Sequence, residues 1–261
     1  MARFIAIGER IHCISPVIRK AMDEMNPEPI IKRAKEQIAG GAGYIDVNIG
    51  PAESNGRELM QWAVKLIQSE CDNIPLALDT SNMAAIEAGM EVYNDVNGKA
   101  LVNSADAGDR IEYLDLAAAN GASCICLCSA GAVPGSLEEI QGFFATLVER
   151  GLEHGLEPED MWMDPLFLVA KGMQDKQQQI LDAIKFFTEN GFPSTGGLSN
   201  VSNGMPKEMR SLMDRTMCVM CIAQGFTSAI VNPNDKALMD AIKSADILMD
   251  RYMYADSYLE L

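Results

Sequence analysis

The chain has 261 residues, of which 48% are hydrophobic, enough for one sizeable core. Its formal net charge is −16, and such an acidic surface repels phosphate backbones, so we expect no nucleic-acid partner. We also expect no membrane span, because no run of 18 apolar residues occurs, and no signal peptide. Seven cysteines, an odd number, favour reduced thiols and a cytoplasmic protein.

Short apolar runs alternate along the chain with longer amphipathic stretches. The predicted strands cover residues 4–8, 44–50, 74–80, 100–104, 123–129, 161–165, 194–200 and 228–232. The predicted helices cover residues 29–39, 56–68, 83–90, 111–119, 137–151, 177–190, 209–224 and 236–252. Strict alternation indicates a parallel sheet, and eight units of roughly 30 residues suggest that it closes.

We therefore expect one α/β domain over residues 1–261, a single (β/α)8 TIM barrel. An open doubly wound sheet would carry a glycine-rich phosphate turn after the first strand, and Gly8-Glu9-Arg10-Ile11-His12 is not one. Helix-end signals support the predicted boundaries. Asn82 is placed to cap the third helix at its start, and Gly191 and Gly225 follow the sixth and seventh.

Polar residues end most of the predicted strands, where a (β/α)8 barrel carries its chemistry. These positions are Glu9, Asp46, Asn48, Asp79, Asn103, Asp164, Asn200 and Asn232. Asp and Asn are poor strand residues, and one or two of them would be ordinary turn or capping residues. Six strands that end on or near them exceed what capping needs. We expect a shared site, with Asn232 the member that capping explains best.

The set supplies carboxylate and amide groups with almost no positive charge. A histidine-based triad is not supported, and a metal site of His and carboxylate ligands is weak. His154 ends a helical pattern, and His12 either reaches the mouth or serves in a loop. The set fits a neutral, flat heterocycle rich in N–H donors. Aspartates would accept paired hydrogen bonds from an amino-pyrimidinone, and asparagines would match its mixed edge.

Two groups of cysteines raise the question of a zinc site. Cys124, Cys126 and Cys128 alternate along the fifth predicted strand, and Cys218 and Cys221 form a C-x-x-C in the seventh predicted helix. Because the groups lie on different elements and free cysteine packs as a small hydrophobe, we expect them to belong to the core and expect no metal.

The strand-end residues recur in a specific order of short motifs. These are Ile7-Gly8-Glu9-Arg10-Ile11, Asp46-Val47-Asn48-Ile49-Gly50-Pro51, Leu78-Asp79-Thr80, Val102-Asn103-Ser104, Asp164-Pro165-Leu166, Gly197-Leu198-Ser199-Asn200-Val201-Ser202, Arg210 and Asp214-Arg215-Thr216. With this order and spacing, the chain resembles the methyltetrahydrofolate–corrinoid methyltransferases, within the pterin-binding barrel group, nearly from end to end.

The resemblance implies methyl transfer between tetrahydrofolate and a corrinoid cobalt, in a direction left open. Asp79, Asn103 and Asp164 would hold the pterin ring, and Asn200 would act as the catalytic residue near the methyl-bearing nitrogen. The further substrate-binding residues implied are Ser199, Arg210, Glu9, Asp46 and Asn48. An amide can donate to that nitrogen as charge develops without titrating itself. Asn203 departs from the family pattern, because related enzymes often carry a longer amide there.

The sequence also leads to expectations about the partner protein and about two alternative functions. The sequence contains no D-x-H-x-x-G corrinoid motif, so the corrinoid (cobalamin) would come from a separate protein that docks over the barrel mouth. The resemblance also implies a homodimer. A dihydropteroate synthase-like enzyme should carry basic residues near the seventh strand, but Leu198-Ser199-Asn200 has no lysine. A non-catalytic pterin-binding module would not need the intact polar set.

Overall fold

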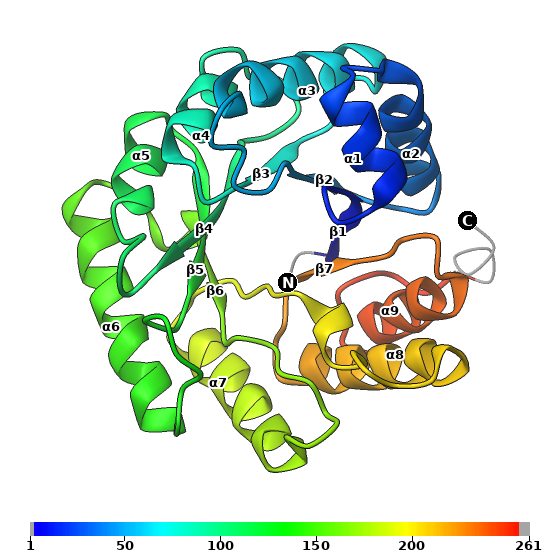
Figure 1. Cartoon of the computed structure of the whole chain (residues 1–261). Coiled ribbons are helices and arrows are strands. Elements are labelled where there is room, and N and C mark those ends of the chain that lie inside the picture. The colour runs from blue at the N-terminus through cyan, green and yellow to red at the C-terminus, as the bar shows by residue number, and fades with distance from the viewer. Residues whose placement is uncertain (1–2, 256–261) are drawn as a thin grey trace.

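The structure is a computed structural model in which residues 3–255 are described, and they form a curled parallel sheet surrounded by helices (Figure 1). Seven strands are hydrogen-bonded in the order β6-β5-β4-β3-β2-β1-β7, all in parallel pairs. The strands are β1 (Ile5–His12), β2 (Tyr44–Asn48), β3 (Leu76–Asp79), β4 (Leu101–Asp106), β5 (Ser123–Leu127), β6 (Met161–Asp164) and β7 (Ser228–Val231).

Helices alternate with these strands and cover the outside of the sheet (Figure 1). They are α1 (Pro16–Asp23), α2 (Pro27–Ala39), α3 (Gly56–Glu70), α4 (Met83–Met90), α5 (Tyr113–Ala119), α6 (Leu137–Glu153), α7 (Gln177–Glu189), α8 (Lys207–Ala223) and α9 (Lys236–Leu248). The eight predicted helices correspond to α2 through α9. The cap of Asn82 is confirmed, because its side chain accepts from Ala85 N, and Gly191 and Gly225 have φ angles of 82° and 105°.

The sequence prediction missed α1. Its start carries ordinary signals, with Ser15 at the N-cap position and Pro16 in the first turn. Its buried residues Ile18, Ala21 and Met22 follow helical spacing. We expected no helix there because the segment falls between the first strand and a helix already assigned to that unit.

The predicted strand 194–200 is wrong as a regular strand. Thr195 N donates to Met163 O and Ile230 N donates to Gly196 O, both at 2.9 Å, so the segment contacts β6 and β7 through isolated bridges. It then turns into the short 3-10 helix Leu198–Asn200 and leads to α8 (yellow in Figure 1). Gly196 and the glycine after it offer no side chains to pack, which weakens a strand. The described residues therefore form a curled parallel sheet of seven regular strands, with residues 194–197 bridging β6 and β7.

The side chains inside the curled sheet form an apolar layer with a polar layer above it. The apolar cluster consists of Ile7, Ala77, Leu101, Ile125 and Trp162, with Ile5, Tyr44 and Ile230 packed against it. Residues two positions further along a strand point to the same face. From β1, β2, β3, β4, β6 and β7 these are Glu9, Asp46, Asp79, Asn103, Asp164 and Asn232. The apolar layer thus forms a floor beneath the polar residues.

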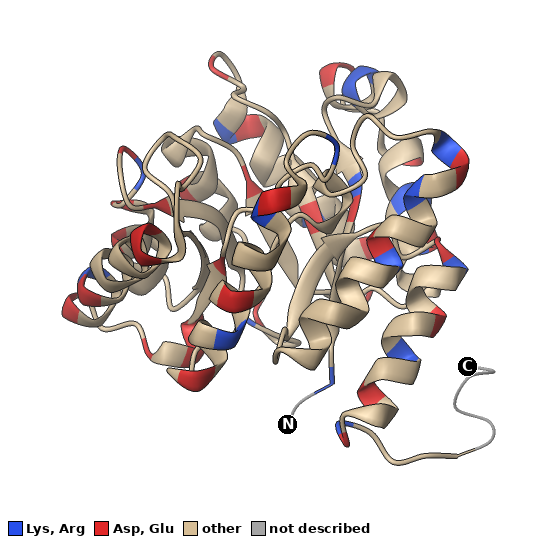
Figure 2. Cartoon of the chain, turned by 90° about the horizontal axis from the view of Figure 1, so that it is seen from below, with Lys and Arg blue, Asp and Glu red and all other residues tan. Residues whose placement is uncertain are grey.

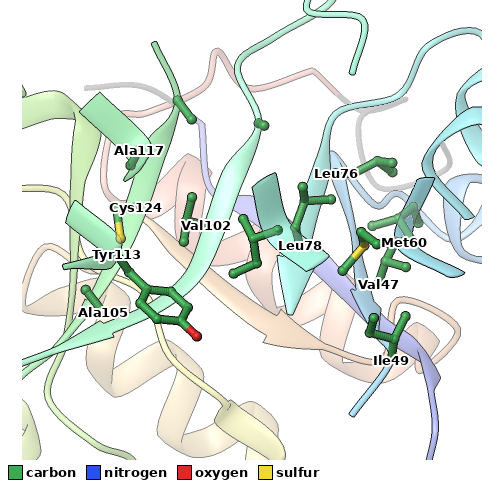
Figure 3. Packing of buried hydrophobic residues seen from close by; sticks show 14 of the residues in the cluster. Val47, Ile49, Met60, Leu76, Leu78, Val102, Ala105, Tyr113, Ala117 and Cys124 are labelled. Carbon is green, nitrogen blue, oxygen red and sulfur yellow. The ribbon is translucent and has the colours of Figure 1, made fainter. Parts of the chain in front are cut away.

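The outward-facing strand residues pack under the helices. Val47, Leu78 and Val102 belong to one buried cluster with Met60 of α3 and Tyr113 of α5 (Figure 3). Each fully buried aliphatic side chain contributes about 1.5–3 kcal/mol relative to exposure. Acidic and basic residues are dispersed over the helices (Figure 2). Within residues 3–255, every helix is too short or too polar to cross a membrane.

Candidate active site

A cavity of about 860 Å³ opens where the strands end. Its wall is Glu9, His12, Ile14, Asp46, Asn48, Asp79, Gly197, Leu198, Ser199, Asn200, Ser202, Asn203, Lys207, Arg210, Ser211, Asp214, Ile230, Val231, Asn232, Asp235 and Leu238. The wall therefore brings together residues from β1, β2, β3 and β7 with the segment that leads into α8. Seven of the nine predicted site residues lie on it: Glu9, Asp46, Asn48, Asp79, Ser199, Asn200 and Arg210.

The register of the central strands places acids and amides side by side. Asn48 of β2 is the Cα partner of Asp79 of β3, which in turn is the partner of Asn103 of β4. The Asn48 amide donates to the Asp79 carboxylate, and Asn103 Nδ2 donates to Asp46 Oδ1 at 2.9 Å. Each of these two carboxylates thus has an amide donor from a neighbouring strand, which holds the two side chains of each pair in place.

Burial perturbs the acids of this network. Burial, the nearby Asp79 charge and Glu9 raise the pKa of Asp46 well above its ordinary value, although the Asn103 hydrogen bond opposes the shift. Burial also raises the pKa of Asp79 to about 6, against the lowering effects of Asn48 and Arg110. A buried carboxylate is costly to ionise unless donors surround it. The site therefore favours a ligand that brings N–H groups.

Asn103 and Asp164 do not line the cavity wall. Asn103 reaches it only through its hydrogen bond to Asp46. Asp164 Oδ1 accepts from Leu166 N at 2.8 Å, and a Cβ added at Gly196 would lie 2.9 Å from that oxygen. Burial raises the pKa of Asp164 to about 7, with the Leu166 bond opposing it. The glycine lets the backbone approach this buried acid closely.

The predicted residues at the mouth take different positions. Ser199 Oγ donates to Glu9 Oε2 at 2.8 Å, and burial raises the pKa of Glu9 although this bond lowers it. Asn200 is exposed, and its Oδ1 accepts from Asn203 Nδ2 at 3.3 Å. Arg210 Nε donates to Met205 O at 3.1 Å. The Asn200 amide thus faces solvent at the entrance while Glu9 lies deeper in the wall.

Sequence reasoning missed Asp214 of α8 as a wall residue. Lys207, Arg210 and Ser211 line the cavity from the same helix, and their spacing of three and four residues from Asp214 or from one another marks one helical face. Ser202 Oγ donates to Asp214 Oδ2 at 2.9 Å, and burial raises the pKa of Asp214 to about 6. The helical spacing from Arg210 to Asp214 was the available signal, but the motif Asp214-Arg215-Thr216 was given no role in the predicted site.

Asn232, His12 and His154 are the other polar residues that the sequence singles out. Asn232 Oδ1 accepts from Asn234 N, as in a turn, and from Arg10 Nη1, each at 3.2 Å. It also lines the cavity, so the residue that capping explains best is part of the cavity wall as well. His12 lines the cavity as well, whereas His154 Nε2 lies 3.5 Å from Asp115 Oδ1, between α5 and the end of α6.

The two groups of cysteines lie in different buried clusters. Cys124, Cys126 and Cys128 pack in the cluster around β2 to β6, and Cys218 and Cys221 pack in the cluster around α8 and α9. Burial raises the pKa of the Cys128 thiol well above its ordinary value. In these positions the cysteines act as small core residues.

A parallel sheet with a polar cavity at its strand ends defines an α/β protein whose site lies where barrel enzymes carry theirs. The family described as pterin binding enzyme matches residues 15–232, and the chain belongs to this family.

Three known proteins illustrate the similarity. The chain is 28% identical over 253 residues to the methylcorrinoid:tetrahydrofolate methyltransferase of Eubacterium limosum, covering 94% of this chain and 91% of that protein. It is 25% identical over 248 residues to the methionine synthase of Mycobacterium leprae (strain TN), covering 87% of this chain but 20% of that protein. Its fold is similar to that of Yersinia pestis DHPS, dihydropteroate synthase, with a TM-score of 0.70, 17% identity and 95% coverage of both chains.

Proposed function

We propose that this chain is a methyltransferase that moves a methyl group between tetrahydrofolate and the cobalt of a corrinoid held by a separate protein. The observation that carries the proposal is a cavity with acid–amide pairs inside and the exposed Asn200 amide at its mouth. The 28% identity to a methylcorrinoid:tetrahydrofolate methyltransferase over nearly the whole chain supports it. We also count the irregular segment 194–197 as a strand that completes a (β/α)8 barrel over one domain.

The acids of the polar layer suit the edge of a pterin. That edge presents an amino group and a ring N–H as donors beside acceptors. We assign Asp79 and Asp164 to those donors and Asn103 to the mixed edge, with Glu9, Asp46 and Asn48 supporting them. Ligand donors would relieve the cost of ionising buried carboxyls. A missed buried partner costs about 1–3 kcal/mol, so the set selects against rings that lack these donors. Because Asp164 and Asn103 lie outside the cavity wall, pterin binding requires local adjustment beside Gly196.

Asn200 is assigned the catalytic role. A methyl group on a tertiary amine is a poor electrophile because the leaving amine is basic. A donor fixed beside that nitrogen stabilises the transition state, and one such preorganised donor is worth roughly 10²–10³ in rate. Asn203 Nδ2 donates a hydrogen bond to Asn200 Oδ1. That contact orients the amide and points its donor nitrogen away from Asn203. Ser199 and Arg210 complete the mouth.

The mouth also fits a large planar group delivered by another protein. Ile14 lines the cavity with 75% of its surface exposed, and Val17 in the following helix is 59% exposed. These apolar side chains, with Asn200, would contact the corrinoid. When bound, the corrinoid supplies the cobalt that accepts or gives the methyl group. We further propose a homodimer and, from the cysteine chemistry, a cytoplasmic location.

A dihydropteroate synthase-like activity is the second candidate. Its fold is similar, and Lys207 and Arg210 on the cavity wall are cations that an anionic substrate would favour. Acidic side chains such as Asp235 share that wall, and negative charge there opposes a diphosphate. We therefore favour methyl transfer.

A spectroscopic assay tests the proposal. The purified chain is mixed with methyltetrahydrofolate and cob(I)alamin, and separately with tetrahydrofolate and methylcobalamin, and the cobalt absorption is followed. We expect turnover in at least one direction. Turnover only with a pterin diphosphate and 4-aminobenzoate would establish the synthase instead. Pterin binding without either reaction would indicate a non-catalytic module.

A further inference from the structure

Asp214 offers a carboxyl group that the proposed pterin contacts do not use. It lies on the wall of the cavity, and its Oδ2 accepts from Ser202 Oγ at 2.9 Å. Its Oδ1 is buried and has no hydrogen-bond partner within residues 3–255. A buried oxygen without a donor destabilises the carboxylate and suits the protonated acid, which can itself donate.

The proposed reaction takes up one proton. Starting from methyltetrahydrofolate, the bond between the ring nitrogen and the methyl carbon breaks. The methyl group passes to cobalt, whose electron pair forms the new bond as Co(I) becomes Co(III). The electron pair of the broken bond stays on the ring nitrogen, which then binds a proton. Asn200 can donate a hydrogen bond there, but an amide does not give up its proton. A titratable acid must supply it.

We propose that Asp214 holds this proton, delivers it to the methyl-bearing nitrogen directly or through one water, and takes it back in the reverse direction. The inference rests on the proposed function. It adds an acid that the family resemblance left without a role, since only the strand-end residues and the mouth were assigned there.

The charges around Asp214 suit a group that exchanges protons near neutrality. Burial is the main cause that raises its pKa to about 6. Glu9 from β1 and Asp235 before α9 also act to raise this pKa, whereas the Ser202 hydrogen bond and Arg210 act to lower it. Lys207 lines the same cavity about two turns earlier on α8. An acid with a pKa close to the working pH transfers protons efficiently in both directions.

The other wall acids are already engaged. Asp79 accepts from Asn48, and Asp46 accepts from Asn103. Glu9 accepts from Ser199. Asp214 is therefore the wall carboxyl, within the described part of the chain, that combines one anchored oxygen with one buried oxygen lacking a partner.

The test is the pH dependence of kcat at saturating methyltetrahydrofolate with cob(I)alamin as acceptor. Saturation removes the contribution of acids that titrate with pterin binding, because kcat reports the substrate complex. We expect the wild-type kcat to fall on the alkaline side as Asp214 loses its proton. Asp214→Asn should lower kcat by roughly a hundredfold at pH 6 and abolish that alkaline fall. Asp214→Glu should restore it.

Asp235→Asn is the matched control. Asp235 lines the same cavity, and its side chain caps α9 by accepting from Leu238 N at 3.2 Å. Asparagine is an equally good cap, so this variant should keep the alkaline fall. Calorimetry on Asp214→Asn should give wild-type pterin affinity, which shows that its site is folded.

The assignment is overturned if Asp214→Asn keeps the alkaline fall of kcat. If Glu9→Gln then loses that fall, the proton belongs to Glu9. A wild-type chain that transfers no methyl group in either direction refutes the proposed function and this inference together. A wild-type chain that transfers it, beside an unaltered Asp214→Asn profile, refutes only the role of Asp214.

Discussion

Replacing Asp164 by asparagine tests two effects of its buried charge. One is the loss of folding stability when the acid ionises, and the other is its contribution to pterin binding. Burial raises the pKa of Asp164 from its ordinary 3.8 to about 7. A folded-state pKa above the unfolded one means that folding favours the protonated acid. The penalty is absent below pH 3.8, grows as the pH rises and is complete above pH 7. At 1.36 kcal/mol for each pH unit, it reaches about 4 kcal/mol.

The asparagine variant should therefore gain stability over the wild type as the pH rises. At pH 5 the acid is already ionised in the unfolded state, so the folded wild type carries a penalty of about 1.6 kcal/mol. The stability that the variant gains over the wild type therefore grows by about 2–3 kcal/mol between pH 5 and pH 8. The asparagine oxygen can keep the bond from Leu166 N. Its new amino group brings a fixed cost of about 1–3 kcal/mol if it finds no acceptor. That cost does not depend on pH, so it cancels from the comparison.

Urea unfolding at pH 5, 6.5 and 8 measures this difference in the free energy of unfolding. Asp23→Asn, at an exposed position on α1, is the control and should show a difference of less than about 0.5 kcal/mol throughout. In parallel, the pterin affinity of Asp164→Asn should fall by roughly 10- to 100-fold, because a charged acceptor is lost. A stability difference that stays constant from pH 5 to pH 8 would refute the burial argument.

Three further substitutions test the site and its frame. Asn200→Ala should cut methyl transfer by roughly a hundredfold, as expected for one preorganised donor, while pterin binding largely survives; unchanged turnover would remove Asn200 from the mechanism. Asp79→Ala should mainly weaken pterin binding, by about tenfold or more, and equal affinities in calorimetry would refute that assignment. Gly196→Ala should destabilise the fold by about 1–3 kcal/mol, because its Cβ would lie 2.4 Å from the Phe167 ring; an unchanged melting temperature would contradict this overlap.

The sequence predicted the regular elements because their signals are local. Apolar runs bounded by polar residues marked the strands, and caps such as Asn82 marked helix ends. The segment 194–200 misled the prediction because its apolar and polar pattern is strand-like. Gly196 has no room for a side chain, because a Cβ there would lie 2.4 Å from the Phe167 ring and 2.9 Å from Asp164 Oδ1. Those contacts come from distant parts of the chain and leave no local pattern.

Some residues of the candidate site could be predicted from the sequence, and others could not. Glu9, Asp46 and Asp79 could be predicted, because parallel strands bring their carboxyl ends to one edge. Asp214 could not be found by that rule, since a helix residue reaches the cavity only through the way α8 packs. Asn232 is a strand-end residue whose two roles the sequence could not separate. Its turn hydrogen bond to Asn234 N explains its residue type fully, yet the curl of the sheet also places it on the cavity wall.

One structural rule connects the fold to the site. Along β1, β3 and β4, an apolar residue of the floor is followed two positions later by a polar residue of the site, as in Ala77 and Asp79. The alternation that seals the interior therefore also aligns the acids. Because the floor excludes water beneath them, burial raises the pKa values of Asp79 and Asp164. A ring that donates hydrogen bonds relieves that penalty, whereas a ring of the same shape that only accepts them leaves it in place. Ligand selectivity and the pH dependence of stability thus have the same physical cause, so variants that remove one should weaken the other.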